Sequence, residues 1–226
     1  PMLAITSFTT IRKTAEKRAG GPAALNKLLP KSKSAKALKA MPDDRYLSLM
    51  SLRVFSSGLK HSMVARKWPD FEEIFFGFDP KRVAAIPDED LEALLKETRI
   101  IRHWGKIKAT QHNAAVIAEI STAHGGLGAW LAAWPEADIV GLWDELQKRF
   151  SQLGGASGPY FLRMAGKDTF ILTTDSIKAL NKWGAYSGDP KGKKARRDVQ
   201  QVFNDWSSES GLCLSEMSRI LALSVD

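Results

Sequence analysis

Apolar residues recur along most of the chain at the spacing of one face of an α-helix. In residues 88–99, Leu91, Leu94 and Leu95 form such a face, and a proline followed by three acidic residues suits the start of a helix. Only residues 170–172 have the composition of a strand, and three residues are too few to build a sheet. The pattern predicts an all-α fold. The same spacing predicts further helices over residues 106–120, 142–150 and 199–206.

Length and composition narrow the class of protein. The 226 residues suit one large domain or two small ones that share a cleft, and 44% hydrophobic residues are enough for a core. No window approaches the ~18 apolar residues that span a bilayer. Residues 1–6 lack the charged and apolar regions of a secretion signal. Cys213 is the one cysteine, so no internal disulfide can form. We expect a cytoplasmic protein that does not contact a membrane.

Positive charge is concentrated in two segments of a chain whose net charge is +8. Such segments attract polyanions, and nucleic acid is the usual one, although a solvated surface that keeps the protein soluble explains charge equally well. We interpret residues 1–40 as a basic helical extension, with a flexible linker at residues 31–39. The first segment holds Arg12, Lys13, Lys17, Arg18, Lys27, Lys31, Lys33, Lys36 and Lys39, and the second holds Lys191, Lys193, Lys194, Arg196 and Arg197.

A turn of small residues separates two predicted helices. Residues 153–162 read LGGASGPYFL, after a helix that ends near Phe150 and before one that begins at Pro159. Glycine permits positive φ and close approach, so successive N–H groups can point at one phosphate. An ordinary helical hairpin is the alternative. If the hairpin, at about residues 143–166, binds DNA, the candidate phosphate contacts are Gly154, Gly155, Ser157, Gly158 and the downstream Lys167.

An aspartate follows the hairpin at the start of another helix. Residues 170–180 read FILTTDSIKAL, and the aspartate is Asp175. This order resembles the helix–hairpin–helix Gly/Pro–Asp superfamily of DNA glycosylases, and the resemblance implies that Asp175 is catalytic. Aspartate is also a good helix N-cap, and both roles stay open. Asp168 is the alternative carboxylate.

Two long strings point to a narrower family. Residues 78–86 read FDPKRVAAI and residues 100–109 read IIRHWGKIKA, followed by Asn113 and Ala114. Together with Gly58 and Leu59 they resemble the bacterial 3-methyladenine DNA glycosylase I family over roughly residues 55–166. The resemblance implies two helical subdomains that flank a base-binding cleft. It also implies that the loop of Gly58 and Leu59 enters the DNA stack when a base is flipped out.

The chain departs from that family at two places. The family has a zinc site made of cysteine and histidine, but Cys213 and the four histidines show no metal-ligand spacing, so we expect no metal site. The family reads its base with a glutamate five residues before the Gly-Leu pair, where this chain has Arg53. A cation cannot accept a hydrogen bond from an exocyclic amine, and it repels a positively charged alkylpurine.

The remaining expectations follow from the resemblance. Bifunctional relatives place a lysine where this chain has Pro159 or Tyr160, so we expect a monofunctional enzyme without a lyase step. No organic cofactor is expected; a monovalent cation held by hairpin carbonyls is the one ion implied. The predicted base pocket contains Arg53, Phe55, His61, Trp68 and Trp104.

The sequence thus predicts a monomeric, nucleoid-associated base-excision repair glycosylase that acts on double-stranded DNA. Residues 41–226 form its catalytic domain, and the expected substrate is a damaged purine, alkylated as in 3-methyladenine. A glycosylase for hypoxanthine or uracil and a non-catalytic DNA-binding module are the alternatives.

Overall fold

The computed structural model describes residues 4–226, and its regular elements are all helical, as predicted. The expectation about a secretion signal falls partly on Pro1–Leu3, which lie outside the described residues. The chain forms two compact units. Unit 1 comprises the described residues up to Ser32 together with Pro135–Leu142 and Asp168–Asp226, and unit 2 comprises Lys33–Trp134 and Trp143–Lys167.

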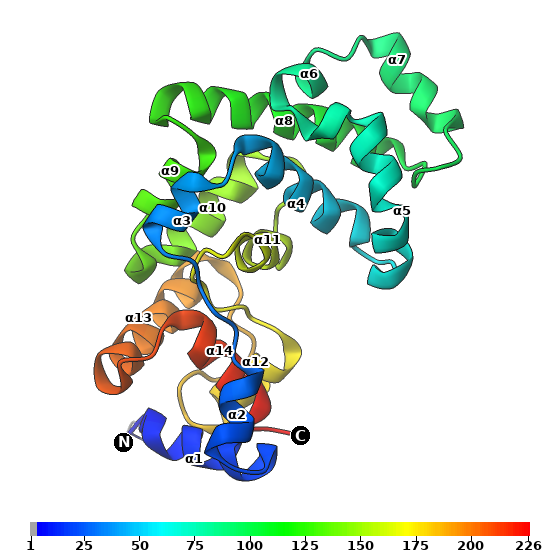
Figure 1. Ribbon diagram of the computed structural model, residues 1–226. Coiled ribbons are helices and arrows are strands. Elements are labelled where there is room, and N and C mark those ends of the chain that lie inside the picture. Colours follow the sequence, from blue (N-terminus) through cyan, green and yellow to red (C-terminus); the bar gives the residue numbers. More distant parts are fainter. Residues whose placement is uncertain (1–3) are drawn as a thin grey trace. The chain divides into compact units, whose positions relative to one another are not determined.

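Unit 1 joins the two ends of the chain. Residues 170–172, the strand candidate, have no regular structure; the Ile171 N–H donates to the hydroxyl of Ser218 at 3.1 Å, so α14 satisfies this backbone without a sheet. The elements of unit 1 are α1 (Phe8–Ala19), α2 (Pro22–Leu28), η3 (Glu136–Asp138), the start of α10 (Ile139–Arg149), α12 (Thr174–Lys182), α13 (Gly192–Ser210) and α14 (Leu214–Leu223). In Figure 1, α1 and α2 are blue, and α12 to α14 run from yellow to red.

The N-terminal helix is part of the core of unit 1. Phe8, Ile11 and Ala15 of α1 are fully buried, and the Phe8 ring lies 5.3 Å from the ring of Trp206. Arg18 donates to the Val225 carbonyl at 3.1 Å. The interpretation of residues 1–40 as an extension is therefore wrong for α1, because its apolar face at i, i+3 and i+7 is covered by C-terminal helices.

Unit 2 holds the two long strings and most of the hairpin. Its longest helix is α8, which contacts both α6 and α9 (Figure 1). The elements of unit 2 are α3 (Ala35–Ala40), α4 (Asp43–Ser56), α5 (His61–Ile74), η1 (Phe76–Phe78), α6 (Pro80–Ala84), α7 (Asp88–Ala93), η2 (Leu94–Lys96), α8 (Trp104–His124), α9 (Leu127–Ala133), the larger part of α10, and α11 (Ser157–Ala165).

The predicted linker is an ordered part of unit 2. The Ser34 hydroxyl caps α3, and Leu38 is buried against α9. A Cβ at Gly128 would overlap the Leu38 carbonyl oxygen, so α3 can approach α9 this closely only because that residue is glycine. Tyr46 donates to the same carbonyl at 2.6 Å. These contacts draw the domain boundary near residue 32 rather than residue 40.

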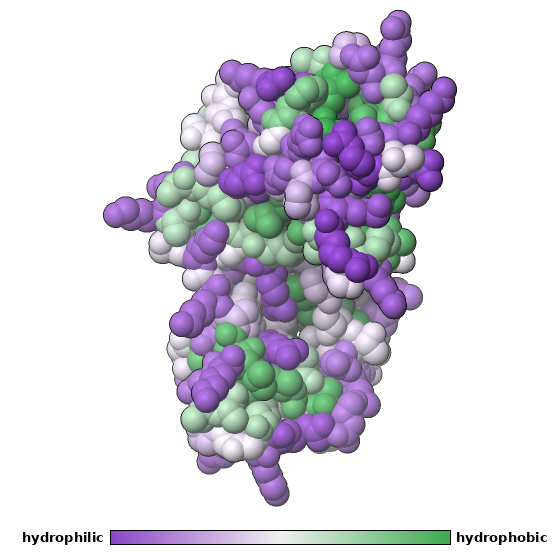
Figure 2. Space-filling view, turned by 45° about the vertical axis from the view of Figure 1, so that its right-hand side comes forward, coloured by the Kyte–Doolittle hydropathy of each residue, from purple (hydrophilic) through white to green (hydrophobic). Residues whose placement is uncertain are grey.

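The visible face of each unit is mostly hydrophilic, with smaller apolar patches between the charged side chains (Figure 2). None of the helices in residues 4–226 has the length and apolarity needed to cross a membrane.

Candidate functional site

A protruding turn follows α4 and carries an exposed leucine. Gly58 has φ +77°, and a Cβ on it would meet nothing within 4 Å, so the turn stands clear of its neighbours. The Leu59 side chain is 38% exposed although it is apolar. An exposed apolar residue on an open glycine turn suits insertion into a stacked partner. We refer to residues 57–60 as the wedge turn.

A buried lysine holds the wedge turn in place. The Lys106 ammonium donates to the carbonyl oxygens of Phe55 at 3.2 Å and Ser57 at 2.9 Å, which are the last carbonyls of α4. Burial lowers the pKa of Lys106. A cation at a helix C-terminus also opposes the negative end of the helix dipole. The lysine in the string at 100–109 is thus a structural link from α8 to the wedge turn, which spacing alone does not reveal.

The hairpin is anchored to α8 by the side chain of Asn113. Its amide donates to the Ser151 carbonyl at 3.1 Å, and its oxygen accepts the Ser151 N–H at 2.7 Å. One residue earlier, His112 bonds to the Arg149 carbonyl at 3.0 Å. These bonds fix the end of α10 and the start of the turn. Sequence reasoning noted Asn113 as part of a string without assigning it this role.

The predicted phosphate contacts in the hairpin include accessible residues and one buried residue. Gly154, Gly155 and Ser157 are at least partly accessible, and Gly155 has φ +58°. No described side chain caps the N-terminus of α11. Gly158 is buried, and a Cβ there would lie 2.9 Å from the Leu153 carbonyl oxygen. Gly158 therefore lets the hairpin close, while the exposed tip offers backbone N–H groups.

A phosphate contact requires an exposed side chain, but Lys167 is buried. It is 1% exposed, and its ammonium donates to the Trp134 carbonyl at 2.5 Å. A phosphate cannot reach an ammonium group in this position, so that prediction is wrong for Lys167. Only the sequence distance from the hairpin suggested it, and distance along the chain does not report burial.

Arg53 and Tyr160, which are far apart in the sequence, lie in contact in unit 2. The Arg53 guanidinium carbon lies 4.7 Å from the centre of the Tyr160 ring. The Arg53 Nε atom is buried and has no hydrogen-bond partner among the described residues. Sequence reasoning placed Arg53 at a base-reading position and Tyr160 at a lyase position, and the structure brings the two side chains together.

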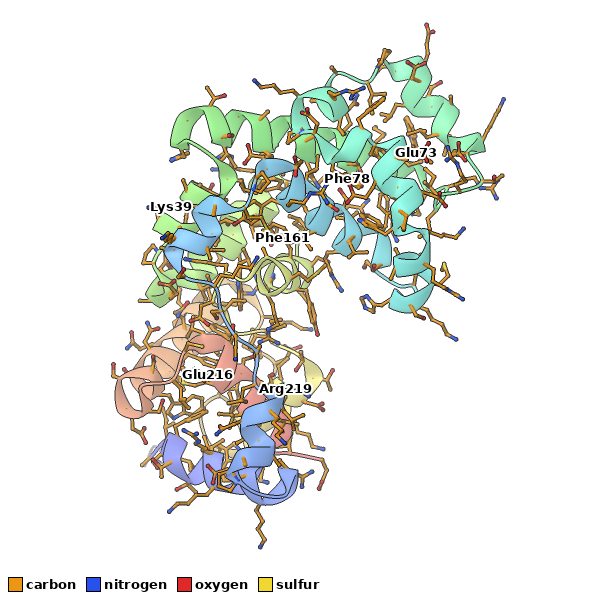
Figure 3. The ribbon with its side chains drawn as sticks, in the orientation of Figure 1. Lys39, Glu73, Phe78, Phe161, Glu216 and Arg219 are labelled. Carbon is orange, nitrogen blue, oxygen red and sulfur yellow. The ribbon has the colours of Figure 1, made fainter. Side chains whose placement is uncertain are left out.

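Two other predicted pocket residues belong to an aromatic core. Phe55 is fully buried, with its ring 4.7 Å from that of Phe71. Trp68 stacks on Phe71 and on Phe78, which Figure 3 labels, at 4.6 and 5.4 Å, and its N–H donates to Ser48 at 3.0 Å. Phe55 therefore offers no ring face to a base, and its prediction is wrong. Trp68 belongs to the same cluster but is only half-buried, so its place in a base pocket stays a prediction. Their rings pack together because α4, α5 and η1 each contribute an apolar face.

An ion pair between Arg45 and Glu72 lies at the edge of this aromatic core. Glu72 accepts the Ser48 hydroxyl at 2.6 Å and two bonds from Arg45 at 2.8 and 2.9 Å. Burial by itself raises the pKa of Glu72, but the bonds from Arg45 and Ser48 outweigh it and hold the pKa below its ordinary value.

Trp104 and His61 lie apart from that pair. Trp104 lines an open cavity of about 840 Å³ together with the acidic side chains of Asp88 and Glu92, and neither Arg53 nor Tyr160 lines it. Lys108 lines the same cavity, with its ammonium 5.8 Å from the centre of the Trp104 ring, so the wall carries charge of both signs. His61 is exposed at the first position of α5, directly after the wedge turn.

In unit 1, the two candidate carboxylates are used differently. The side chain of Asp168 accepts the N–H groups of Leu214 at 3.0 Å and Ser215 at 2.9 Å, so it caps α14, the helix that carries the labelled Glu216 and Arg219 in Figure 3. Asp175 is exposed and has no hydrogen bond or ion pair with a described residue. The N-cap of α12 is Thr173, whose hydroxyl accepts the Ser176 N–H at 3.1 Å. Asp175 is therefore not the cap.

The donor set for a zinc site is not assembled in residues 4–226, which hold no group of three or more His, Cys, Asp or Glu side chains suited to a metal. His103 caps α8 by accepting the Lys106 N–H at 3.1 Å. Burial raises the pKa of the Cys213 thiol to about 12, which disfavours the thiolate that binds zinc. The residues present do not fit the metal of the resembled family.

A family profile and a curated enzyme each match part of the sequence. The sequence profile of the methyladenine glycosylase family matches residues 37–152. DNA-3-methyladenine glycosylase 1 of Escherichia coli is 37% identical over 70 residues, which are 31% of this chain and 37% of that enzyme. The aligned part thus spans little more than a third of that relative.

Solved structures match the fold more widely than the sequence. A mutant of 3-methyladenine DNA glycosylase I from Staphylococcus aureus matches with a TM-score of 0.51 and 22% identity, over 67% of this chain and 91% of that one. The 8-oxoguanine DNA glycosylase of Methanocaldococcus jannaschii matches with a TM-score of 0.54 and 15% identity, over 93% and 91% of the two chains. At these identities the likeness establishes the fold. The chain therefore belongs to the methyladenine glycosylase family and has the all-helical fold of the helix–hairpin–helix DNA glycosylases.

Proposed function

We propose that this protein is a monofunctional DNA glycosylase that flips a damaged purine out of duplex DNA and hydrolyses its N-glycosidic bond. The observation that carries the proposal is that the wedge turn, the hairpin tip and the Arg53–Tyr160 pair all belong to one compact unit. That unit contains the part of the chain that matches the family, apart from a few residues of α10 and the segment before it.

Each of these features has a role in base flipping. Leu59 fills the gap that the flipped nucleotide leaves in the stack, which offsets part of the few kcal/mol that flipping costs. The backbone N–H groups at the tip of the hairpin hold a phosphate. The flipped base lies against the side chains of α4 and α11.

In the hydrolysis, the C1′–N bond breaks with its electron pair going to the base, and water adds to C1′. The proton that water loses ends on a base that is neutral in DNA, and goes to solvent when the base is already a cation. Positive charge develops on the sugar, and a carboxylate stabilises that charge and orients the water. Asp175 is the candidate, because its carboxylate is exposed and unbonded whereas Asp168 caps a helix. Pro159 or Tyr160 stands where bifunctional relatives have a lysine, and Lys167 is buried, so no Schiff base is expected.

The second basic segment supports DNA as the partner. The first turns of α13 expose Lys193, Lys194 and Arg197. Positive side chains there are repelled by the positive end of the helix dipole, which costs free energy. An anionic partner compensates for that cost. Binding to duplex DNA should therefore weaken with salt, with log K falling by about 0.9 per phosphate neutralised.

Excision from a panel of duplexes tests the proposal. The full chain should release at least one damaged purine and leave an abasic site whose backbone stays intact until alkali is added. Borohydride trapping of a covalent complex would contradict the monofunctional assignment. Tight binding without release of any base would show a non-catalytic DNA-binding module instead.

The family indicates an alkylated purine such as 3-methyladenine as the first substrate to test. A purine with a carbonyl group, such as hypoxanthine, is the second candidate, and the arginine at position 53 favours it.

A further inference from the structure

The chemistry of Arg53 restricts the base that this enzyme can accept. This inference rests on the proposed function and concerns its substrate class. Arg53 forms no salt bridge with a carboxylate of the described residues, and its Nε atom is buried without a hydrogen-bond partner. A buried N–H group of a cation without an acceptor costs free energy. The arrangement is therefore incomplete until an acceptor arrives.

Tyr160 helps to position the guanidinium group. The guanidinium carbon lies 4.7 Å from the ring centre, a distance at which a cation is attracted to the ring face. A guanidinium group is itself planar and presents its N–H groups in a fork, which matches two acceptors in a row. On a purine, a carbonyl oxygen at C6 and the N7 atom form such a pair.

A second unsatisfied group lies on the same side of α4. Ser56 follows Arg53 by three positions, so the two side chains are neighbours on the helix surface. Ser56 is 2% exposed, and its hydroxyl has no partner among the described residues. The last turn of α4 thus holds two neighbouring polar groups without a partner among the described residues, and a ligand that brings an acceptor to Arg53 accounts for the first of them.

The position of these groups agrees with that of a flipped base. Arg53 lies in the last turn of α4, directly before the wedge turn. Insertion of Leu59, as proposed, brings the displaced base to this end of α4. A cationic alkylated adenine there meets a second cation at short range, and its amino group offers a donor to a group that is itself only a donor.

We infer that the enzyme selects an uncharged purine that carries a carbonyl oxygen at C6, of which hypoxanthine is the simplest, over cationic alkylated adenine. The Arg53 guanidinium donates to the carbonyl oxygen and to the N7 atom of such a base.

Single-turnover release of three bases by the full chain tests this inference. Hypoxanthine is neutral with a carbonyl, ethenoadenine is neutral without one, and 3-methyladenine is a cation. Each rate is divided by the rate of spontaneous loss from the same DNA, because 3-methyladenine leaves readily by itself. We expect the greatest acceleration for hypoxanthine, by about 10- to 100-fold over the other two.

Variants then assign the preference to its residue. Arg53→Glu and Arg53→Gln should each remove the preference for hypoxanthine, with Tm measured to verify that they fold. Lys81→Glu makes the same change of charge at an exposed position of α6 and should leave the order of the three bases intact. Greater acceleration for 3-methyladenine in the parent protein overturns the inference and leaves the proposed function standing. A hypoxanthine preference that survives both Arg53 changes also overturns it, and release of none of the three overturns it together with the glycosylase assignment for these purines.

Discussion

The Lys106 ammonium lies 2.9 Å from the carbonyl oxygen of Ser57, and this bond ties the start of α8 to the first residue of the wedge turn. Lys106→Met should therefore free the turn. The loss of hydrogen bonds from a charged donor costs about 1–3 kcal/mol. We expect amide hydrogen exchange at Leu59 to quicken at least about tenfold and base excision to fall. Lys108→Met, two residues along and exposed, should change neither quantity. Unchanged exchange at Leu59 in Lys106→Met would show that the turn holds itself.

The side chain of Leu59 has a matched control in the same unit. Leu59 is 38% exposed and Leu95 is 39% exposed, so each alanine substitution removes a similar apolar surface from solvent contact. Both variants should keep the Tm of the parent within a few degrees. Only Leu59→Ala should slow excision, because only this side chain fills the stack. Equal excision by the two variants would remove the role assigned to the wedge turn.

If Asp175 has the proposed catalytic role, Asp175→Asn should slow excision by on the order of a hundred- to a thousand-fold, because the charge that stabilises the developing positive charge on the sugar is lost. Folding and DNA affinity should hold, since the carboxylate has no hydrogen-bond or ion-pair partner among the described residues. Thr173→Ala is the opposite case: it removes the cap of α12 and should cost about 1 kcal/mol of stability with little effect on rate. If both variants lose stability and neither loses rate, the catalytic carboxylate lies elsewhere.

Two glycines of the hairpin should respond differently to alanine. A Cβ at Gly158 would lie 2.9 Å from the Leu153 carbonyl, so the backbone must shift to admit it. A Cβ at Gly154 would first meet the flexible side chain of Gln147 at 3.4 Å, which is ordinary contact. We expect Gly158→Ala to lower the Tm by several degrees, corresponding to about 1–3 kcal/mol, and Gly154→Ala to leave it nearly unchanged. Similar melting of the two variants would contradict the packing role of Gly158.

Stability should depend on pH through Glu72. Its folded pKa is lowered, so the ionised form contributes stability at neutral pH, and that contribution is lost as the pH falls below the ordinary glutamate range and through the folded pKa. In urea unfolding, Glu72→Gln should be less stable than the parent at pH 7, and the gap should narrow as the pH falls below the ordinary glutamate range. Glu73→Gln is the control: the Glu73 side chain is 73% exposed, as its labelled position in Figure 3 illustrates, and its loss should matter little at either pH. A gap that stays constant with pH would show that the Glu72→Gln variant is destabilised by altered packing instead of lost charge.

Most local features were predictable because they depend on residues close together in the chain. The helix at residues 106–120 was predicted, and the structure extends it to Trp104–His124, where His103 caps its start. The hairpin was expected near residues 143–166, and its second helix begins at Ser157, two residues before Pro159. Glycines, prolines and caps act within one or two turns, so their effect can be read from the sequence.

The sequence by itself therefore determined the helical class, the hairpin and the family strings. Only the tertiary structure decided which charged and aromatic side chains remain accessible. Lysine and tryptophan are residue types that often contact DNA. In this protein, however, Lys167 donates to the Trp134 carbonyl and Trp68 packs in an aromatic cluster. Arg53 and Tyr160 come together although about a hundred residues separate them. Burial and pairing of this kind depend on how distant helices pack, because the free energy of a side chain is set by all of its neighbours and not by those beside it in the chain.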